Sequence, residues 1–230
     1  MTVETPAVVV DVRRLERNIT VWAAELHARD VGLRPHTKTS KCADSGMHRS
    51  GIAGEDLGGL AQRCIDLGLD VRGAFTYAGQ AYYSCDAPPA AADDEVRTLE
   101  LAAEVFQSLG IIPTLLSAGS TPTALHSARP PVTEERPGTY VFMDRQQVAL
   151  GAGATDDLAL YVLTTVVASH PDGRFVLDAG SKTLSTDRAP WISGHGYLPA
   201  YPDATIARLS EHHAVATTTG TRPVVGEVVA

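Results

Sequence analysis

Hydrophobic and polar residues alternate along the first 140 residues in two distinct patterns. Short aliphatic runs predict strands at Ala7–Val10, Leu33–His36, Val71–Thr76 and Ile111–Leu116. Apolar residues at helical spacing predict helices at Val12–Asp30, Leu57–Leu67 and Val96–Phe106. Gly68 and Gly110 follow the last two of these helices, where C-terminal caps belong. Strands that alternate with helices over short connections are typical of parallel βα units.

From about Pro137 onward the pattern changes to strands without intervening helices. Strand-like runs, separated by Gly, Pro and Asp turns, occur at 140–143, 160–169, 174–178 and 214–219. This favours a mostly antiparallel β domain from about residue 141 to the end, to which the strand Ala7–Val10 adds. The segment Asp86–Glu95, which contains two prolines, is expected to be a loop.

The predicted βα region is too short to close a barrel within one chain. It runs from Leu33 to Tyr140, which is 108 residues, and has room for four or five strands. A closed (β/α)8 barrel takes roughly 200–250 residues. We therefore predict an α/β plus β fold: an incomplete (β/α)8 (TIM-type) barrel at 31–140, and a mostly antiparallel β domain formed by 1–30 and 141–230.

Composition narrows the class of protein. The 230-residue chain has a formal net charge of −8 and no Lys/Arg block, which argues against a nucleic-acid or anionic-membrane partner. Its longest apolar runs are too short to span a membrane, and the N-terminus lacks the pattern of a signal peptide. Cys42, Cys64 and Cys85 are widely spaced. We expect a cytoplasmic protein with reduced thiols.

Lys38 is the candidate nucleophile. It follows the predicted strand Leu33–His36 and has Arg34 and Lys41 near it in sequence. Only a neutral lysine attacks an aldehyde to form a Schiff base, and burial beside cationic neighbours lowers the pKa of a lysine. The alternative is a surface lysine in a basic loop.

Three segments are candidates for binding an anion or a cofactor ring. Arg49 lies between Gly46 and Gly51, and its forked guanidinium suits a phenolate or phosphate oxygen. Two loops, each beside a predicted strand, carry the small or hydroxylated residues of a backbone-lined anion cradle, namely Gly119, Ser120 and Thr121 in one and Gly138 and Thr139 in the other. Tyr82 belongs to a tyrosine cluster after Val71–Thr76. The alternatives are a solvated arginine, ordinary turns and a tyrosine packed in the core.

Taken in order, these segments resemble the fold-type III pyridoxal phosphate enzymes, and among them the D-threonine aldolase / D-serine dehydratase branch of the alanine racemase N-terminal-domain superfamily. The resemblance spans nearly the whole chain. It is carried by Thr5–Asp11, Arg34–Thr39, Asp44–Gly51, Phe75–Gly79, Ser117–Thr123, Arg136–Phe142, Val176–Lys182, Tyr201–Asp203 and Leu209–Glu211.

This resemblance implies a pyridoxal phosphate-binding barrel with a β domain, paired as a homodimer, that acts on a small D-amino acid such as D-serine or D-threonine. Lys38 stands where the family has its Schiff-base lysine, Arg49 where it has an arginine near the cofactor phenolic oxygen, and Tyr82 where it has a tyrosine of the cofactor pocket. The residues that fall in its phosphate-binding loops are Gly119, Ser120, Thr121, Gly138 and Thr139.

Two departures from the family pattern bear on activity. Only Cys42 and Ala43 separate the lysine segment from the Arg49 segment, where the family has several βα units. The chain also ends at Ala230, just short of the segment that binds a divalent metal in many family members, so no metal ligand is assigned.

Three hypotheses follow from the sequence. The first is a pyridoxal phosphate-dependent lyase that acts on D-amino acids through a Lys38 Schiff base. The second is a cofactor-binding remnant of the same lineage that no longer catalyses. The third is an amino-acid racemase, which would need a second acid/base facing Lys38, and the sequence does not identify that residue.

Overall fold

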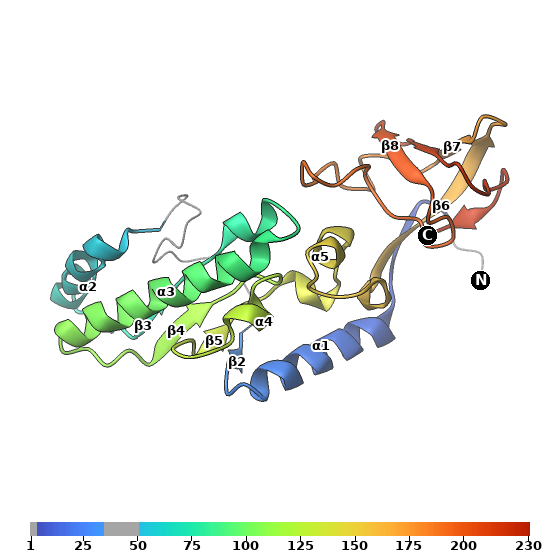
Figure 1. Cartoon of the computed structure of the whole chain (residues 1–230). Coiled ribbons are helices and arrows are strands. Elements are labelled where there is room, and N and C mark those ends of the chain that lie inside the picture. Colours follow the sequence, from blue (N-terminus) through green and yellow to red (C-terminus); the bar gives the residue numbers. More distant parts are fainter. Residues whose placement is uncertain (1–3, 35–50) are drawn as a thin grey trace. The chain divides into compact units, whose positions relative to one another are not determined.

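The computed structural model describes residues 4–34 and 51–230 and divides the chain into two compact units (Figure 1). One unit, formed by 16–141 and 147–154, contains a parallel sheet with helices. The other, formed by the residues up to Leu15 together with 142–146 and 155–230, contains an antiparallel sheet. The predicted α/β plus β fold class is confirmed. Within the described ranges, no helix is long and apolar enough to cross a membrane.

The parallel sheet of the first unit has four strands in the order β2-β5-β4-β3. These strands are β2 (Gly32–Leu33), β5 (Glu134–Glu135), β4 (Leu115–Ala118) and β3 (Gly73–Phe75). Leu33 pairs with Glu135, so the first strand of this unit lies beside its last. This pairing of the first strand with the last is the one found in closed βα barrels, but a closed barrel also needs every other strand to have a neighbour on both sides. Among the described residues β2 and β3 lie at the two ends of the sheet, so the expected incomplete barrel is confirmed.

Three long helices accompany this sheet, α1 (Val12–His27), α2 (Leu57–Asp66) and α3 (Ala87–Ser108). Asp11 caps α1, because its Oδ1 accepts the Arg14 N–H at 3.2 Å. Gly68 and Gly110 follow α2 and α3 with φ of +76° and +74°, a conformation that glycine adopts without strain, so both predicted caps are confirmed.

The core of the first unit lies between α3 and the sheet. Figure 1 shows α3 running along β3 and β4. Leu99 and Phe106 of α3 are buried against Leu116 of β4, and Leu57 of α2 and Leu26 of α1 belong to the same cluster. The apolar spacing in the sequence therefore predicts the packed faces of these helices correctly.

The prediction of a loop at Asp86–Glu95 is wrong, because α3 begins at Ala87. Pro88 and Pro89 lie in the first turn, where the helix needs no backbone N–H donor from them. The longer helix places Glu95 on the buried face, four residues before Leu99. A carboxyl group thus lies in the core of the unit.

Short helices connect the longer elements. They are η1 (Gly54–Asp56), η2 (Gly79–Tyr82), α4 (Ala124–Ser127), η3 (Thr139–Val141), α5 (Arg145–Ala149) and η4 (Thr155–Asp157). The predicted strand at 140–143 is wrong, because η3 occupies its first part. Tyr140 packs instead against Trp22 of α1, with ring centroids 5.4 Å apart.

The second unit is an antiparallel sheet in the order β1-β6-β7-β9-β8, with β10 also paired to β6. Its strands are β1 (Ala7–Val10), β6 (Leu160–Ser169), β7 (Arg174–Leu177), β9 (Ala214–Thr217), β8 (Thr205–Leu209) and β10 (Val228–Val229). Ala7 pairs with Leu163, which confirms that the N-terminal strand joins this sheet. Phe175, Leu177 and Ile206 lie in its core. The sequence pattern missed β8.

Candidate functional site

Polar residues gather where three neighbouring parallel strands end. Thr76 follows β3, Gly119 follows β4 and Arg136 follows β5. Parallel strands present their carboxyl ends at one edge of a sheet, and βα-barrel enzymes place their sites there. The two predicted phosphate-binding loops begin at this edge.

These two loops lie side by side. Gly119, Ser120 and Thr121 are buried after β4, whereas Gly138 is exposed and Thr139 half-buried after β5. The backbone N–H of Tyr140 donates to Thr121 Oγ1 at 3.2 Å and ties one loop to the other. The structure therefore brings together the five residues that the sequence placed in an anion cradle.

The backbone amides of the two loops divide into two groups. The Gly119 N–H donates to Glu95 Oε1 and the Ser120 N–H to Thr123 Oγ1, both at 3.1 Å. Within the described ranges, the amides of Thr121, Gly138 and Thr139 have no protein acceptor. Three backbone donors on adjoining loops fit the phosphate group of the cofactor that the sequence resemblance implies.

Glu95 of α3 joins the loops that follow β3 and β4. Its Oε1 accepts the backbone N–H of Ala78 at 3.1 Å and that of Gly119 at 3.1 Å, and the Thr76 hydroxyl at 3.3 Å. Its Oε2 is buried without a hydrogen-bond partner in the described part of the chain. Burial raises the pKa of Glu95, and hydrogen bonds from Thr123, Gly119, Ala78 and Thr76 oppose that effect.

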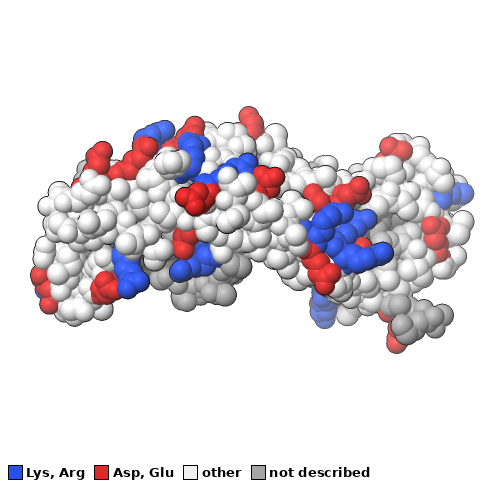
Figure 2. Space-filling view, turned by 90° about the horizontal axis from the view of Figure 1, so that it is seen from below, with Lys and Arg blue, Asp and Glu red and all other residues white. Residues whose placement is uncertain are grey.

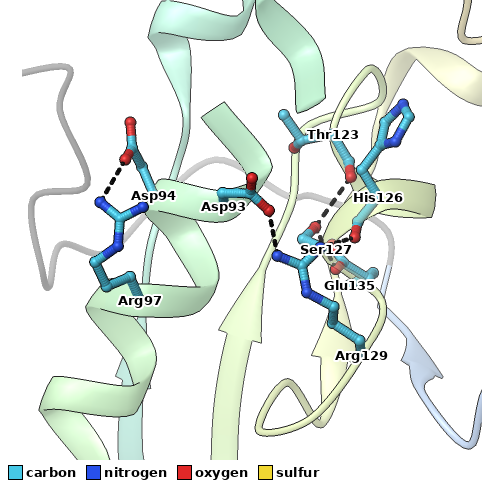
Figure 3. A network of polar contacts seen from close by, with 8 residues as sticks. All are labelled: Asp93, Asp94, Arg97, Thr123, His126, Ser127, Arg129 and Glu135. Atoms are coloured by element: carbon cyan, nitrogen blue, oxygen red, sulfur yellow. Dashed lines mark hydrogen bonds and ion pairs between the residues drawn. The ribbon is translucent and has the colours of Figure 1, made fainter. Parts of the chain in front are cut away.

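Glu135 of β5 is the second buried carboxyl group. Its Oε1 accepts the Ser127 hydroxyl at 2.7 Å, and that hydroxyl also lies 3.0 Å from the carbonyl oxygen of Thr123 (Figure 3). Its Oε2 is likewise buried without a described partner. Burial and the negative charge of Glu95 raise the pKa of Glu135 to about 9. Glu135 is therefore protonated at neutral pH.

Arg136 supplies positive charge at the same edge. Its Nε donates to Ser117 Oγ at 2.6 Å, its Nη2 donates to the Thr76 carbonyl oxygen at 2.8 Å, and its guanidinium lies 4.1 Å from the centroid of the Phe75 ring. The guanidinium is thus fixed against the ends of β3 and β4 by hydrogen bonds and a cation–π contact.

The other predicted site residues fall into two groups. Tyr82 is the last residue of η2 and is half-buried. Its hydroxyl accepts a hydrogen bond from Gln147 Nε2 at 3.4 Å. Lys38 and Arg49 lie outside the described residues. Among the described residues no group of three or more His, Cys, Asp or Glu side chains could hold a metal ion.

Sequence reasoning missed Glu95 and Glu135. Glu95 stands at helical spacing from Ala92 and Leu99, so an acidic residue within an apolar stripe was the available signal. The assignment of Asp86–Glu95 to a loop concealed it. Glu135 offers no such signal, because it adjoins Glu134 and Arg136 in a charged stretch and its burial depends on the assembled sheet.

Comparison with protein families decides the lineage. Residues 21–146, more than half of the chain, match the family model described as the alanine racemase N-terminal domain. The chain belongs to the alanine racemase N-terminal domain family. Residues 159–230 match the serine dehydratase domain model. In this member of the family, the carboxyl edge of the parallel sheet and both candidate loops fall inside the first matched region.

Individual relatives agree with this assignment. The chain is 28% identical over 283 aligned positions to D-threo-3-hydroxyaspartate dehydratase of Delftia sp. strain HT23, covering 82% of this chain and 74% of the relative. The solved structure of that dehydratase superposes with a TM-score of 0.86 at 23% identity, over 99% of this chain and 89% of the other. D-threonine aldolase from Filomicrobium marinum superposes with a TM-score of 0.83 at 17% identity, over 99% and 86%. Both structures show the same fold.

Proposed function

We propose that the chain is a pyridoxal phosphate-binding lyase that acts on small D-amino acids. The observation that carries the proposal is the joined pair of loops at the carboxyl edge of the sheet, with three backbone amides suited to a phosphate group. Membership of the alanine racemase N-terminal domain family and the serine dehydratase match support it, as do the activities after which the two relatives are named. The expected homodimer and cytoplasmic location belong to the same proposal.

Each part of the proposed site has a distinct task. The amides of Thr121, Gly138 and Thr139 bind the cofactor phosphate, and the Tyr82 hydroxyl, oriented by Gln147, lines the pocket. Lys38 would hold the cofactor through its aldehyde, and Arg49 would bind its phenolic oxygen. When bound, pyridoxal phosphate supplies the electron sink for breaking a bond next to the amino-acid nitrogen.

The divalent metal that the sequence resemblance implies does not fit the described residues, because they offer no cluster of ligands for it. The proposal therefore routes no step through a metal ion.

A second candidate is a chain that binds the cofactor without turnover. The sheet has open ends in the described part of the chain, which favours it, because an open edge admits water to a site that depends on preorganised hydrogen bonds. The alignment with the Delftia dehydratase favours it too. The alignment has 283 positions and includes 82% of the 230 residues of this chain, which is about 189. About 94 aligned positions of the dehydratase therefore have no counterpart in this chain.

A turnover assay separates the two candidates. The purified chain is supplied with pyridoxal phosphate and, in turn, D-threonine, D-serine and D-threo-3-hydroxyaspartate, with and without Mn²⁺. Release of glycine, pyruvate or oxaloacetate above the rate of free cofactor supports the lyase. Lys38→Ala is the matched control, since it removes only the proposed aldehyde-binding amine. Cofactor binding without product release supports the second candidate, and absence of both contradicts the proposal.

A further inference from the structure

We propose that Glu95 and Glu135 form a buried carboxyl pair that retains one proton and positions the Gly119–Thr121 loop, so that phosphate binding at this loop depends on that proton. The inference rests on the proposed function, because it takes the loop to be the phosphate site. It adds a proton-linked positioning device to that site. Neither glutamate contacts the substrate in this proposal.

Glu95 fixes the position of the loop. One oxygen of Glu95 accepts amide hydrogens from Ala78 and Gly119, which belong to loops after two different strands. A single side chain from α3 therefore sets the separation of these loops. Because the Gly119 amide points to Glu95, the donors left for an anion are those further along, beginning with Thr121.

Glu135 closely approaches the same loop. Gly119 has a φ of +105°, and a Cβ atom there would lie 2.2 Å from Glu135 Oε2 and 3.0 Å from the Arg136 backbone nitrogen. The carboxyl group of Glu135 thus fills the space that a side chain at position 119 would need. Glu95 binds one side of the Gly119 backbone and Glu135 packs against it.

The charge balance of the pair sets its protonation. The positive charge of Arg136 opposes the rise in the pKa of Glu135, and the same guanidinium donates hydrogen bonds to Ser117 and Thr76. In the described part of the chain, two other ion pairs lie on these elements: Arg129 with Asp93 beside α4 (Figure 3), and Arg34 with Glu134 on the neighbouring strands. Two ionised glutamates would leave excess negative charge in the core, so one proton is retained.

Donor geometry assigns that proton to Glu135. Glu95 accepts two backbone N–H groups and the Thr76 hydroxyl, all of which stabilise a carboxylate. Glu135 accepts one hydroxyl, from Ser127, and faces the charge of Glu95. Titratable groups on the other packed elements are Tyr77 and Tyr82 after β3 and His126 on α4. A neutral Glu135 leaves Glu95 as the negatively charged member of the pair.

The consequence is proton-linked anion binding. Loss of the Glu135 proton places a second carboxylate behind the phosphate loop, and like charges in a poorly solvated region repel strongly. The affinity for a phosphate dianion therefore falls as the pH rises through the titration of the pair. If one proton is linked to binding, the dissociation constant rises up to about tenfold per pH unit.

The test combines infrared spectroscopy with calorimetry on the full chain. Infrared difference spectra between wild type, Glu135→Gln and Glu95→Gln report a protonated carboxyl group directly. We expect a carboxylic-acid band at pH 7 that is absent in E135Q. Titration with inorganic phosphate between pH 8 and pH 10, where phosphate remains a dianion, should show weakening affinity for wild type and constant affinity for E135Q. Glu95→Ala should weaken binding at least tenfold at every pH, and Glu95→Gln should restore most of it.

The outcomes are distinguishable. A missing carboxylic-acid band, or one unchanged in E135Q, overturns the inference whether or not phosphate binds. So does phosphate affinity in wild type that is constant from pH 8 to pH 10. A normal band with no phosphate binding at any pH contradicts the proposed phosphate site, and the coupling with it.

Discussion

The backbone N–H of Arg34 donates to the carbonyl oxygen of Glu135 at 2.8 Å and joins the first parallel strand to the last. Gly32 makes the equivalent bond to Thr133 at 2.9 Å. Residues of a strand alternate in the side to which their backbone groups point, so those of Leu33 point to the edge of β2 that has no partner strand among the described residues. At the other end of the sheet, Thr76 donates to Ser117, so the backbone of Phe75 faces the edge of β3 that likewise has no described partner strand.

We predict that these two edges make the chain self-associate. An unpaired strand edge is a template for another chain, and two four-stranded sheets supply the eight strands of one barrel. In a two-fold arrangement β2 of one copy pairs with β3 of the other. Sedimentation should therefore show dimers or larger species at micromolar concentration.

Disulfide trapping tests which edges meet. In a background with the three native cysteines changed to Ser, Leu33→Cys chains are mixed with Phe75→Cys chains under mild oxidation. Mixed-chain disulfides should dominate over those formed by either variant alone. A monodisperse monomer, or equal cross-linking within each single variant, would contradict the prediction.

Much of the fold follows from the sequence, and the exceptions have identifiable causes. Apolar spacing locates α1 and α2, and Gly68 and Gly110 mark helix ends. The start of α3 was missed because a Pro-Pro pair is compatible with both a loop and a first helical turn. Glu95 was missed together with the start of α3, and Glu135 was missed because its burial depends on the assembled sheet, which no local pattern reports.

Substituting Gly119 tests the contact with Glu135. Gly119→Ala adds a Cβ atom in a positive-φ backbone, 2.2 Å from Glu135 Oε2, so either the loop or the carboxyl group must move. We expect the free energy of unfolding to fall by about 3 kcal/mol or more. Gly110→Ala is the matched control, because its φ of +74° is similar and no atom lies within 4 Å of the added Cβ; it should cost about 1–2 kcal/mol. Equal losses in chemical denaturation would refute the steric argument.

Stability should depend on pH through Glu135. Its pKa is raised to about 9 in the folded chain, against roughly 4.3 for an unfolded glutamate, so between these values the folded state holds a proton that the unfolded state has released. The free energy of unfolding therefore falls as pH rises across this window, by up to about 1.4 kcal/mol per pH unit. Denaturation of Glu135→Gln should show a shallower slope. Glu104→Gln, on the exposed face of α3, should keep the wild-type slope.

The central claim is that this chain binds pyridoxal phosphate through Lys38, and the most direct test is to reduce the complex with borohydride and map the labelled peptide. Lys38, Lys41 and Lys182 are the three lysines of the chain, so the assignment is unambiguous. Lys182 is exposed and paired with Glu211 at 3.1 Å, which makes it the matched control site. The account predicts label on Lys38, loss of label in Lys38→Ala and no change in Lys182→Ala. Label on Lys41 or Lys182, or no stable label at all, would contradict it.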